Sequence, residues 1–360
     1  MTTSLGSTDV LFFIPDIGGF TRFVTNTEVA HSQHIIKDLL EVLVDANQLG
    51  MQVSEVEGDA VLFVRTGGPP PFADLLSQTK KMYVDFHSYL KQFEMLRICQ
   101  CGACVGANRI TLKVVVHAGP ASTMDVKGQT KFIGKSIIVA HRLLKNSVPL
   151  AEYLLVTEET LNQLDGIAAQ PPSQEGSSNY DEIGEVPYRY WPLADFLAEV
   201  KVKPPEPFGI DRPRLLMETS CTIKASPAAV YQTLIDLPAR MQWEDGVKEI
   251  AIRDQGPNQI GKVHRCVRGN HDPDLVTSDV KITTATMEFW ETDLRKMGTA
   301  RYLVERAPDD TTRLTFGFYC RDNILVRLLF KLVYVPQMER ALKNALPKLA
   351  ALVEGLRSAN

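Results

Sequence analysis

A proline-rich stretch divides the chain, and this feature most limits how it can fold. The sequence KVKPPEPFGIDRPR occupies residues 201–214, with prolines at positions 204, 205, 207 and 213. Proline fixes φ and removes an amide donor, so this stretch favours extended backbone and suits a semi-rigid spacer. In a chain of 360 residues, each side of it is long enough to bury its own core. We predict a first domain over residues 1–200, a linker over 201–213 and a second domain over 214–360.

Composition excludes several classes of protein. The content of 44% hydrophobic and 23% charged residues is ordinary for a soluble globular chain. No apolar run approaches the roughly 18 to 20 residues that span a membrane, and the N-terminus lacks the pattern of a secretory signal, so we expect a cytoplasmic protein without a transmembrane segment. A net charge of −4 argues against nucleic acid as a partner. The six cysteines are expected to be thiols in that compartment.

The first domain mixes helices and strands. Apolar spacing predicts, in order, a strand at 10–14, a helix at 29–49, a hairpin of strands 51–56 and 60–64, a helix ending near 93, a strand at 110–119, a loop at 120–132, a helix at 136–146 and a strand at 151–157. Residues 168–182 are predicted to form a surface loop. The fold class is therefore α+β.

The second domain shows a different order. A strand at 216–224 leads to a helix for which Ser226 is the expected N-cap and Pro227 the first helical residue. Strand-like runs over residues 247–320 predict an antiparallel sheet, and residues 323–356 predict a long terminal helix. Pro336 and Pro347 lie inside that helix, where we expect kinks or a break.

Two carboxylates lie at the ends of segments that are predicted to be strands. Asp16 ends the first apolar run, in FFIPDIGGF, and Asp59 lies in the hairpin sequence EGD. If these strands are adjacent, the two carboxylates converge, and oxygen ligands of this kind suit Mg²⁺ or Mn²⁺. Gly18 and Gly19 would let backbone approach a phosphate. Alternatively, Asp16 caps a helix and Asp59 makes a turn.

Residues 9–166 resemble the catalytic domain of class III adenylyl and guanylyl cyclases. Four segments match in order: FFIPDIGGFTRF, SEVEGDAVLFV, LKVVVHAGPA and FIGKSIIVAHRLL. The resemblance implies a ferredoxin-like βαββαβ core, a head-to-tail homodimer with a site shared between protomers, and a purine nucleoside triphosphate as substrate. The same pattern resembles a divergent bacterial subfamily without an assigned activity.

The resemblance also implies roles for individual residues. Asp16, Asp59 and the carbonyl of Ile17 match the metal ligands, and Arg142 matches the catalytic arginine that contacts the triphosphate. The substrate-binding positions are Gly18, Gly19, Phe20, Thr21, Glu55 and Lys131. Glu55 and Lys131 occupy the base-selecting positions in an unusual combination, which either forms a salt bridge or reads the base.

One position departs from the pattern of active cyclases. The asparagine expected four residues before the arginine is Ile138, which offers no hydrogen bond. Losing one oriented transition-state donor typically costs about a hundred- to a thousandfold in rate, so a slow cyclase is predicted. The alternative is an inactive pseudo-cyclase that serves as a ligand-controlled binding or interaction module.

Three cysteines gather in the sequence CQCGAC, at positions 99, 101 and 104. This spacing lets Cys99, Cys101 and Cys104 supply three thiolates to Zn²⁺ or an iron–sulfur centre, although structural zinc needs a fourth ligand and none is adjacent. Redox chemistry and ordinary loop thiols are the alternatives. His117 is better explained as a hydrogen-bonded core residue.

Residues 214–357 resemble the START-like, polyketide-cyclase-type helix-grip family, through the segment TIKASPAAVYQTLIDLPARMQWEDGVKEI and the terminal helix. That family closes a long helix over a sheet around an apolar cavity for lipids or other hydrophobic molecules. The aromatic residues that would line the cavity, or fill it, are Trp243, Trp290, Tyr302, Phe316 and Phe318, with His264, Arg265 and His271 as possible polar groups. Leu325, Leu328, Leu329 and Leu332 are predicted to be core and cavity wall.

The leading hypothesis is therefore a divergent nucleotidyl cyclase-like domain regulated by a hydrophobic ligand on the second domain. A carrier of lipids or hydrophobic ligands, in which the first domain serves only dimerisation, is a third interpretation.

Overall fold

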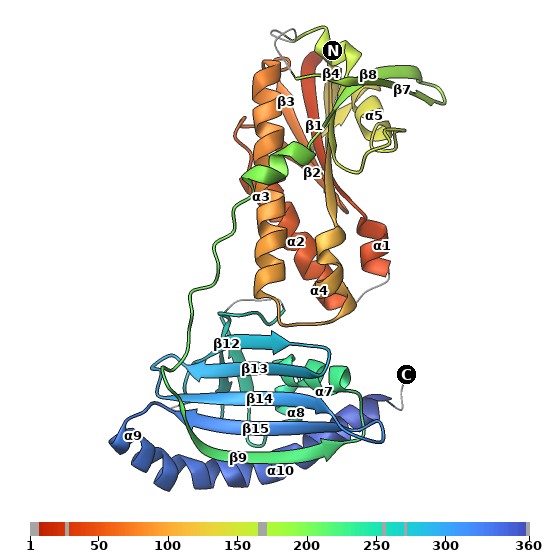
Figure 1. Cartoon of the computed structure of the whole chain (residues 1–360). Coiled ribbons are helices and arrows are strands. Elements are labelled where there is room, and N and C mark those ends of the chain that lie inside the picture. Colours follow the sequence, from red (N-terminus) through yellow and green to blue (C-terminus); the bar gives the residue numbers. More distant parts are fainter. Residues whose placement is uncertain (1–6, 26–28, 165–170, 254–256, 270–271, 358–360) are drawn as a thin grey trace. The chain divides into compact units, whose positions relative to one another are not determined.

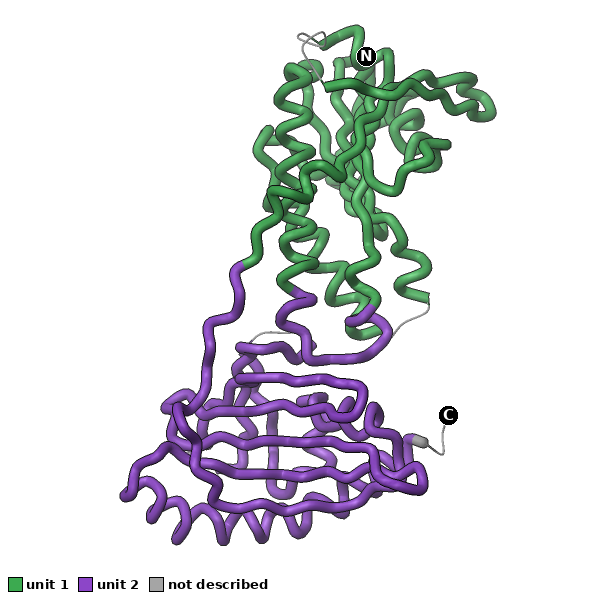
Figure 2. Tube along the Cα trace, viewed as in Figure 1, with its two compact units in different colours: residues 1–92, 106–202 green, residues 93–105, 203–360 purple. Residues whose placement is uncertain are grey.

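The computed structural model describes residues 7–25, 29–164, 171–253, 257–269 and 272–357. The chain divides into two compact units (Figure 2): residues 1–92 with 106–202, and residues 93–105 with 203–360. Each unit has its own sheet, so we describe the two separately.

The first unit is built on a sheet with the strand order β2-β3-β1-β4 at one side. Its strands are β1 (Thr8–Gly18), β2 (Gln52–Glu57), β3 (Ala60–Thr66) and β4 (Thr111–Val126), connected by helices α2 (Val29–Asp45) and α3 (Phe72–Leu96) (Figure 1). Along the chain the order is strand, helix, two strands, helix and strand. Together with the spatial order β2-β3-β1-β4, this is the ferredoxin-like arrangement. The predicted fold class of the first domain is confirmed.

The sheet continues past β4 and carries shorter helices. Strand β6 (Tyr153–Thr157) runs parallel to β4, and β8 (Gly184–Pro192) and β7 (Gln174–Tyr180) follow it in antiparallel pairs. The remaining elements are α1 (Phe20–Thr25), η1 (Ala107–Arg109), α5 (Lys135–Arg142), α6 (Glu158–Leu161) and η3 (Ala194–Glu199). The helix predicted at 136–146 thus ends earlier than expected.

Two predicted loops are strands instead. Residues 120–132 belong largely to β4 and to β5 (Gln129–Ile133), which form a hairpin, and β7 lies in the stretch predicted as a surface loop. Residues 168–170 of that stretch lie outside the described residues. These strands are mostly polar and solvent-facing, so they lack the apolar alternation that reveals a half-buried strand.

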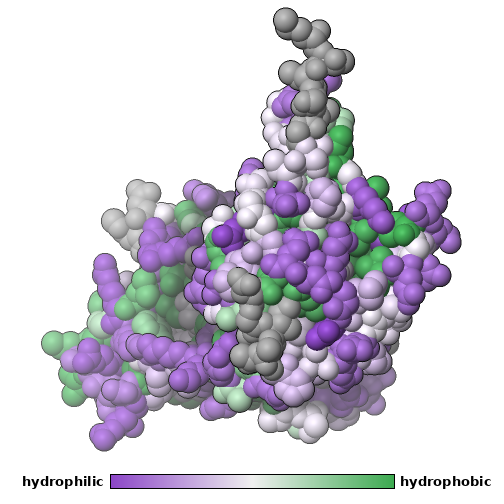
Figure 3. Space-filling model, turned by 90° about the horizontal axis from the view of Figure 1, so that it is seen from above, coloured by the Kyte–Doolittle hydropathy of each residue, from purple (hydrophilic) through white to green (hydrophobic). Residues whose placement is uncertain are grey.

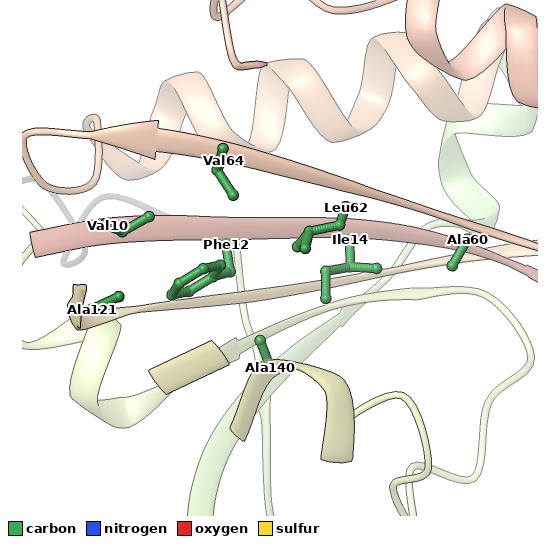
Figure 4. Packing of buried hydrophobic residues seen from close by; sticks show 8 residues of the cluster. All are labelled: Val10, Phe12, Ile14, Ala60, Leu62, Val64, Ala121 and Ala140. Atoms are coloured by element: carbon green, nitrogen blue, oxygen red, sulfur yellow. The ribbon is translucent and has the colours of Figure 1, made fainter. Parts of the chain in front are cut away.

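The core of this unit lies on both faces of β1, because successive residues of a strand point to opposite faces. Figure 4 shows Val10, Phe12 and Ile14 side by side with Leu62 and Val64 of β3 on the face that α5 covers; all five are at most 2% exposed. The alternate residues of β1, including Leu11 and Phe13, are equally buried on the other face.

The second unit contains an antiparallel sheet of seven strands in the order β10-β11-β12-β13-β14-β15-β9. The strands are β9 (Arg214–Ile223), β10 (Glu249–Ile252), β11 (Val263–Val267), β12 (Leu275–Ile282), β13 (Thr286–Asp293), β14 (Gly298–Arg306) and β15 (Thr312–Cys320). Helices α7 (Pro227–Ile235) and α8 (Arg240–Trp243) follow β9, and α10 (Val335–Arg357) ends the described chain. Segment 93–105 of this unit contains α4 (Gly102–Gly106) almost whole. The helix-grip prediction is confirmed, as is the cap, since Ser226 accepts a hydrogen bond from the Ala229 amide.

The terminal helix is interrupted. Helix α9 (Ile324–Leu329) passes into a π-helical turn, η4 (Phe330–Tyr334), and α10 starts directly before Pro336. The chain stays helical on both sides of Pro336, with the π-helical turn just before it, and the α-helix continues through Pro347.

The prediction that four leucines near the start of this helix are core is wrong. The exposed fractions of Leu325, Leu328, Leu329 and Leu332 are 74%, 56%, 52% and 68%. The buried positions of the terminal helix lie in α10 instead, at Val335, Ala345, Leu349 and Val353. Apolar spacing alone does not distinguish the part of a helix that covers the sheet from the part that does not.

No helix in the described part of the chain is both long and apolar enough to cross a membrane. In Figure 3, hydrophilic residues cover much of the face seen from above, with hydrophobic residues in separate patches between them.

Candidate functional site

Asp16 and Asp59 lie at adjoining ends of β1 and β3. Asp16 pairs in register with Ala60, the residue after Asp59. The Ile17 amide donates a hydrogen bond of 2.9 Å to the Asp59 carbonyl, which holds the β2–β3 turn against the end of β1. Gly58 supplies the positive φ of that turn, 62°. Asp16 is 8% exposed although it carries a carboxylate.

A lysine that the sequence analysis did not single out faces Asp16. Lys113 lies opposite Asp16 in the β1–β4 register, and its Nζ is 3.2 Å from Asp16 Oδ2 and 2.7 Å from the Leu144 carbonyl. Burial raises the pKa of Asp16; Lys113 opposes this shift, and the charge of Asp59 adds to it. Burial also raises the pKa of Asp59. Only the strand register reveals Lys113, because it is far from Asp16 in sequence.

The donor chemistry at this strand end fits a divalent metal ion. Asp16 and Asp59 provide carboxylate oxygens, which Mg²⁺ and Mn²⁺ prefer, and the Lys113 ammonium already compensates part of their charge. Gly18 is required for packing, since a Cβ there would lie 2.2 Å from Thr111 Oγ1. Gly19 has φ of 84° and is exposed next to the start of α1, where Phe20 is half-buried and Thr21 exposed.

Arg142 and Ile138 share a surface pocket of ≈ 680 Å³. Its lining comes from α5, the turn after it and β7: Ile137, Ile138, His141, Arg142, Lys145 and Tyr180. Ile138 is 50% exposed there, so an apolar side chain lies where the resemblance leads one to expect an amide. Arg142 and Lys145 make the pocket suitable for an anion.

Glu55 and Lys131, the two base-selecting positions, form a salt bridge. Lys131 Nζ donates to Glu55 Oε1 at 2.6 Å, between β2 and β5. This hydrogen bond lowers the pKa of the Glu55 carboxyl. Of the two arrangements considered from the sequence, the salt bridge is the one present.

The three thiols of the CQCGAC segment lie together. The Sγ atoms of Cys99, Cys101 and Cys104 all lie within 4.8 Å of one another. Hydrogen bonds from the Cys101 and Cys104 thiols lower the pKa of Cys99 to about 3, and these contacts raise the pKa of Cys104.

Two histidines of the first unit, His117 and His87, have structural partners. His117 is 1% exposed, with Nδ1 2.9 Å from Thr157 Oγ1, so the prediction of a hydrogen-bonded core residue is confirmed. His87 Nε2 lies 2.8 Å from Glu152 Oε1.

In the second unit, cross-strand pairing shows on which face of the sheet each predicted cavity residue of β13, β14 and β15 lies. Phe289 lies opposite Tyr302, which lies opposite Phe316, so these share one face; Phe318, two residues on, points the same way. Their rings are in contact, with Phe289 and Tyr302 stacked at 4.5 Å. Trp243 of α8 is also buried.

Trp290 lies on the opposite face of this sheet. It pairs in register with Arg301, donates a hydrogen bond to Glu288 and contacts Tyr319. The prediction that Trp290 shares a cavity with the other aromatic residues is therefore wrong. Neighbouring residues of a strand face opposite ways, and the sequence did not show which of Phe289 and Trp290 faces inward.

A charged group is buried on the inner face. Arg240 of α8 donates to both oxygens of Glu291, at 2.5 and 2.9 Å, and its guanidinium carbon lies 5.8 Å from the Tyr302 ring centre. His264 is adjacent, with Nε2 3.5 Å from Glu291 Oε1, and burial lowers its pKa to about 4.

Three polar atoms around this group lack partners within the described residues: Arg240 Nε, Trp243 Nε1 and His264 Nδ1. A buried donor without a partner costs free energy, so this region suits an acceptor oxygen. Arg265 instead pairs with Asp274 at the surface, and His271 lies outside the described residues.

Fold and site together define a two-part protein: a ferredoxin-like domain with a carboxylate pair at its strand ends, and a helix-grip domain. Residues 36–153 match a family described as "Protein of unknown function (DUF2652)", and residues 214–354 match "Polyketide cyclase / dehydrase and lipid transport". "Uncharacterized protein Rv2561/Rv2562" of Mycobacterium tuberculosis is 30% identical over 156 residues, which are 43% of this chain and 72% of that protein. The chain belongs to the family of this mycobacterial protein.

The solved structures to which the chain is similar include nucleotidyl cyclase domains. The catalytic core of a rhodopsin-guanylyl cyclase with converted specificity, in complex with ATPalphaS, is 18% identical with a TM-score of 0.38, over 51% of this chain and 95% of that one. A non-canonical dimeric guanylyl cyclase domain of the RhoGC fusion protein from the aquatic fungus Blastocladiella emersonii is 21% identical with a TM-score of 0.35, over the same shares.

Proposed function

We propose that the first unit binds a purine nucleoside triphosphate together with Mg²⁺ or Mn²⁺ and acts as a slow, divergent class III nucleotidyl cyclase. The observation that carries this proposal is the carboxylate pair: Asp16 is buried at the end of β1, directly beside the turn that holds Asp59. Lys113 compensates part of the charge of Asp16, and a divalent ion would compensate the remaining charge of the two carboxylates.

The roles of the residues follow from their chemistry. Asp16 and Asp59 would hold the divalent ion, with the Ile17 carbonyl as a further oxygen, and the bound ion supplies positive charge to the triphosphate. Lys113 keeps Asp16 partly compensated at 3.2 Å in the absence of the ion. Glu55 and Lys131 would contact the base after their salt bridge opens.

Arg142 would contact the triphosphate from a second copy of the chain. Its pocket also contains Lys145, and a head-to-tail homodimer of the kind implied by the resemblance would bring this pocket to the partner's carboxylate pair. A guanidinium suits charge that develops on phosphate oxygens. Ile138 in the same pocket removes one donor, which lowers the expected rate by about a hundred- to a thousandfold.

The second unit would bind a hydrophobic molecule that regulates the first. The unpartnered Arg240 Nε, Trp243 Nε1 and His264 Nδ1 favour a ligand that is apolar over most of its surface and carries a carbonyl, carboxylate or hydroxyl oxygen. A lipid or a similar amphipathic molecule has this chemistry.

The test is a turnover assay of the full chain with ATP or GTP and Mn²⁺. We expect slow formation of a cyclic nucleotide, abolished in Asp59→Asn and retained in Asp9→Asn. Asp9 is the matched control because it lies on the same sheet, at the exposed start of β1. If the wild type produces no more cyclic nucleotide than Asp59→Asn, the cyclase proposal is wrong.

A second candidate function is an inactive nucleotide-binding module, and the exposed Ile138 favours it. Calorimetry would then show nucleotide and lipid binding without turnover. If nucleotide with Mn²⁺ does not shift the melting temperature at all, a carrier of hydrophobic ligands becomes the better interpretation.

A further inference from the structure

The start of the terminal helix in the second unit exposes a row of large apolar side chains. The α9 surface is defined by six residues of α9 and the π-helical turn that are between 44% and 74% exposed: Ile324, Leu325, Leu328, Leu329, Leu332 and Val333. Soluble monomers rarely expose contiguous apolar patches of this kind, and where they do, the patch commonly marks an interaction site. We propose that the α9 surface docks on an anionic lipid bilayer. This inference goes beyond the proposed function and does not depend on it.

Helix α9 is attached to the second unit by its other side. The Phe330 ring stacks on Phe318 of β15, with ring centres 5.7 Å apart, and on Tyr334, with ring centres 4.7 Å apart. The side chain of Asn323 caps the helix by accepting hydrogen bonds of 2.9 and 3.2 Å from two amides of the first turn. These contacts hold α9 beside the end of β15 (Figure 1) and fix which of its sides is exposed.

The apolar residues of the α9 surface gather on one side of the helix. At roughly 100° per residue, Ile324 and the four exposed leucines fall within a sector of about 140°. Phe330, which contacts the sheet, lies opposite the middle of this sector, and Arg327 and Lys331 lie at one of its margins. An apolar side with basic groups at its border is the pattern of helices that lie in the membrane interface.

The charge around the α9 surface complements anionic lipid. Residues 321–334 contain three basic residues, Arg321, Arg327 and Lys331, against one acidic residue, a formal charge of +2 in a chain whose net charge is −4. The acidic residue, Asp322, is paired with Arg214 at 3.0 Å. Arg327 and Lys331 are both exposed. Basic groups placed at the headgroups strengthen binding to an anionic bilayer.

The length of this segment suits a position along the bilayer surface. Helix α9 has 6 residues and the π-helical turn has 5, whereas a helix that crosses the hydrocarbon core needs about 20 apolar residues. The apolar side chains would therefore enter the boundary between headgroups and acyl chains, and Arg327 and Lys331 would remain at the headgroups.

A bilayer fits the α9 surface better than a second copy of the chain does. In a two-fold contact the surface would meet itself, so Arg327 and Lys331 of both copies would come together in one interface. Like charges brought together in this way disfavour association. Anionic headgroups have the opposite charge, and acyl chains accept the leucines.

Vesicle co-sedimentation of the full chain tests the apolar part of the proposal. The protein should bind vesicles of phosphatidylcholine with phosphatidylglycerol more strongly than vesicles of phosphatidylcholine alone. The double variant Leu328→Glu, Leu332→Glu should bind the anionic vesicles at least tenfold more weakly. Leu356→Glu is the matched control, because Leu356 is a similarly exposed leucine at the end of α10, and it should bind like the wild type.

A second pair of variants tests the role of charge. Arg327→Gln, Lys331→Gln should lose most of the preference for phosphatidylglycerol, and added salt should weaken wild-type binding by screening. The control is Arg340→Gln, Lys343→Gln, which removes two exposed basic residues of α10 and should keep the preference.

Hydrogen exchange on the unaltered protein covers the case in which a variant does not fold. Amides of residues 324–334 should exchange more slowly with anionic vesicles present than without them. Unchanged exchange there, absence of vesicle binding, or equal binding by Leu328→Glu, Leu332→Glu would each overturn the proposal. A wild-type dimer that this double variant converts to monomer would overturn it too, by assigning the α9 surface to a second copy.

Discussion

At the scale of single residues, burial decides which protonation state a side chain keeps. His117 is 1% exposed on β4, beside Thr157, and burial lowers its pKa to about 4. An ordinary histidine in the unfolded chain titrates near 6.5. The folded protein therefore holds His117 neutral over a pH range in which the unfolded chain takes up a proton.

This shift makes stability depend on pH. A depressed histidine pKa stabilises the fold above the unfolded value, and the contribution is lost as pH falls from about 6.5 towards 4. Between about pH 7.5 and pH 5, His117 should cost the wild type about 2 kcal/mol of unfolding free energy that His117→Asn does not lose. Urea denaturation at both pH values measures the difference. An NMR titration of His117 with a midpoint near 6.5 would contradict it.

Single residues also show what sequence reasoning can find. Asp16 and Asp59 were identifiable because Asp16 ends an apolar run of strand length and Asp59 lies directly before another. Lys113 was not, because it reaches Asp16 only through the strand register. Lysine is a common residue, and no local pattern distinguishes Lys113 from a surface residue.

At the scale of elements, the β4–β5 hairpin shows that a turn can lack the usual sequence signal. Its two-residue turn consists of Lys127 and Gly128, with φ of 54° and 82°, between the paired residues Val126 and Gln129. Positive φ at both turn positions suits the right-handed twist of the strands, and asparagine followed by glycine is the usual signal. Lysine in the first position weakens that signal, so the segment was predicted as a loop.

The turn geometry yields a stability prediction. Gly128→Ala should destabilise the protein by about 1 to 2 kcal/mol, since an L-residue with a side chain disfavours the left-handed conformation. No heavy atom among the described residues lies within 4 Å of the added Cβ, so only backbone strain contributes. Lys127→Asn should be neutral or stabilising and is the matched control. Urea denaturation gives both values, and an alanine variant as stable as the wild type would refute this account.

The helix at the C-terminus differs from this hairpin, because its existence is predicted by the sequence. Its existence follows from the sequence, because apolar spacing acts locally. Which of its leucines are buried does not follow, since both α9 and α10 contain leucines and only α10 contributes buried positions.

At the scale of the whole molecule, the two units have different sheets. The first has strands in the order β2-β3-β1-β4 with a parallel pair beyond, and the second is antiparallel throughout. Two motif families in one chain indicated this division, and the proline-rich stretch gave its approximate position. Residues 93–105 also belong to the second unit, although no change in composition near them indicates this.

The sequence by itself determined the α+β class, the two folds and most helices and strands. These depend on periodicity, on turn residues and on ordered motifs, all of which act over short distances along the chain. Tertiary structure decided that Trp290 faces away from Tyr302 and that Lys113 lies against Asp16. Each of these depends on strand register or on contacts between residues far apart in sequence, and a one-residue difference in facing or register changes the answer.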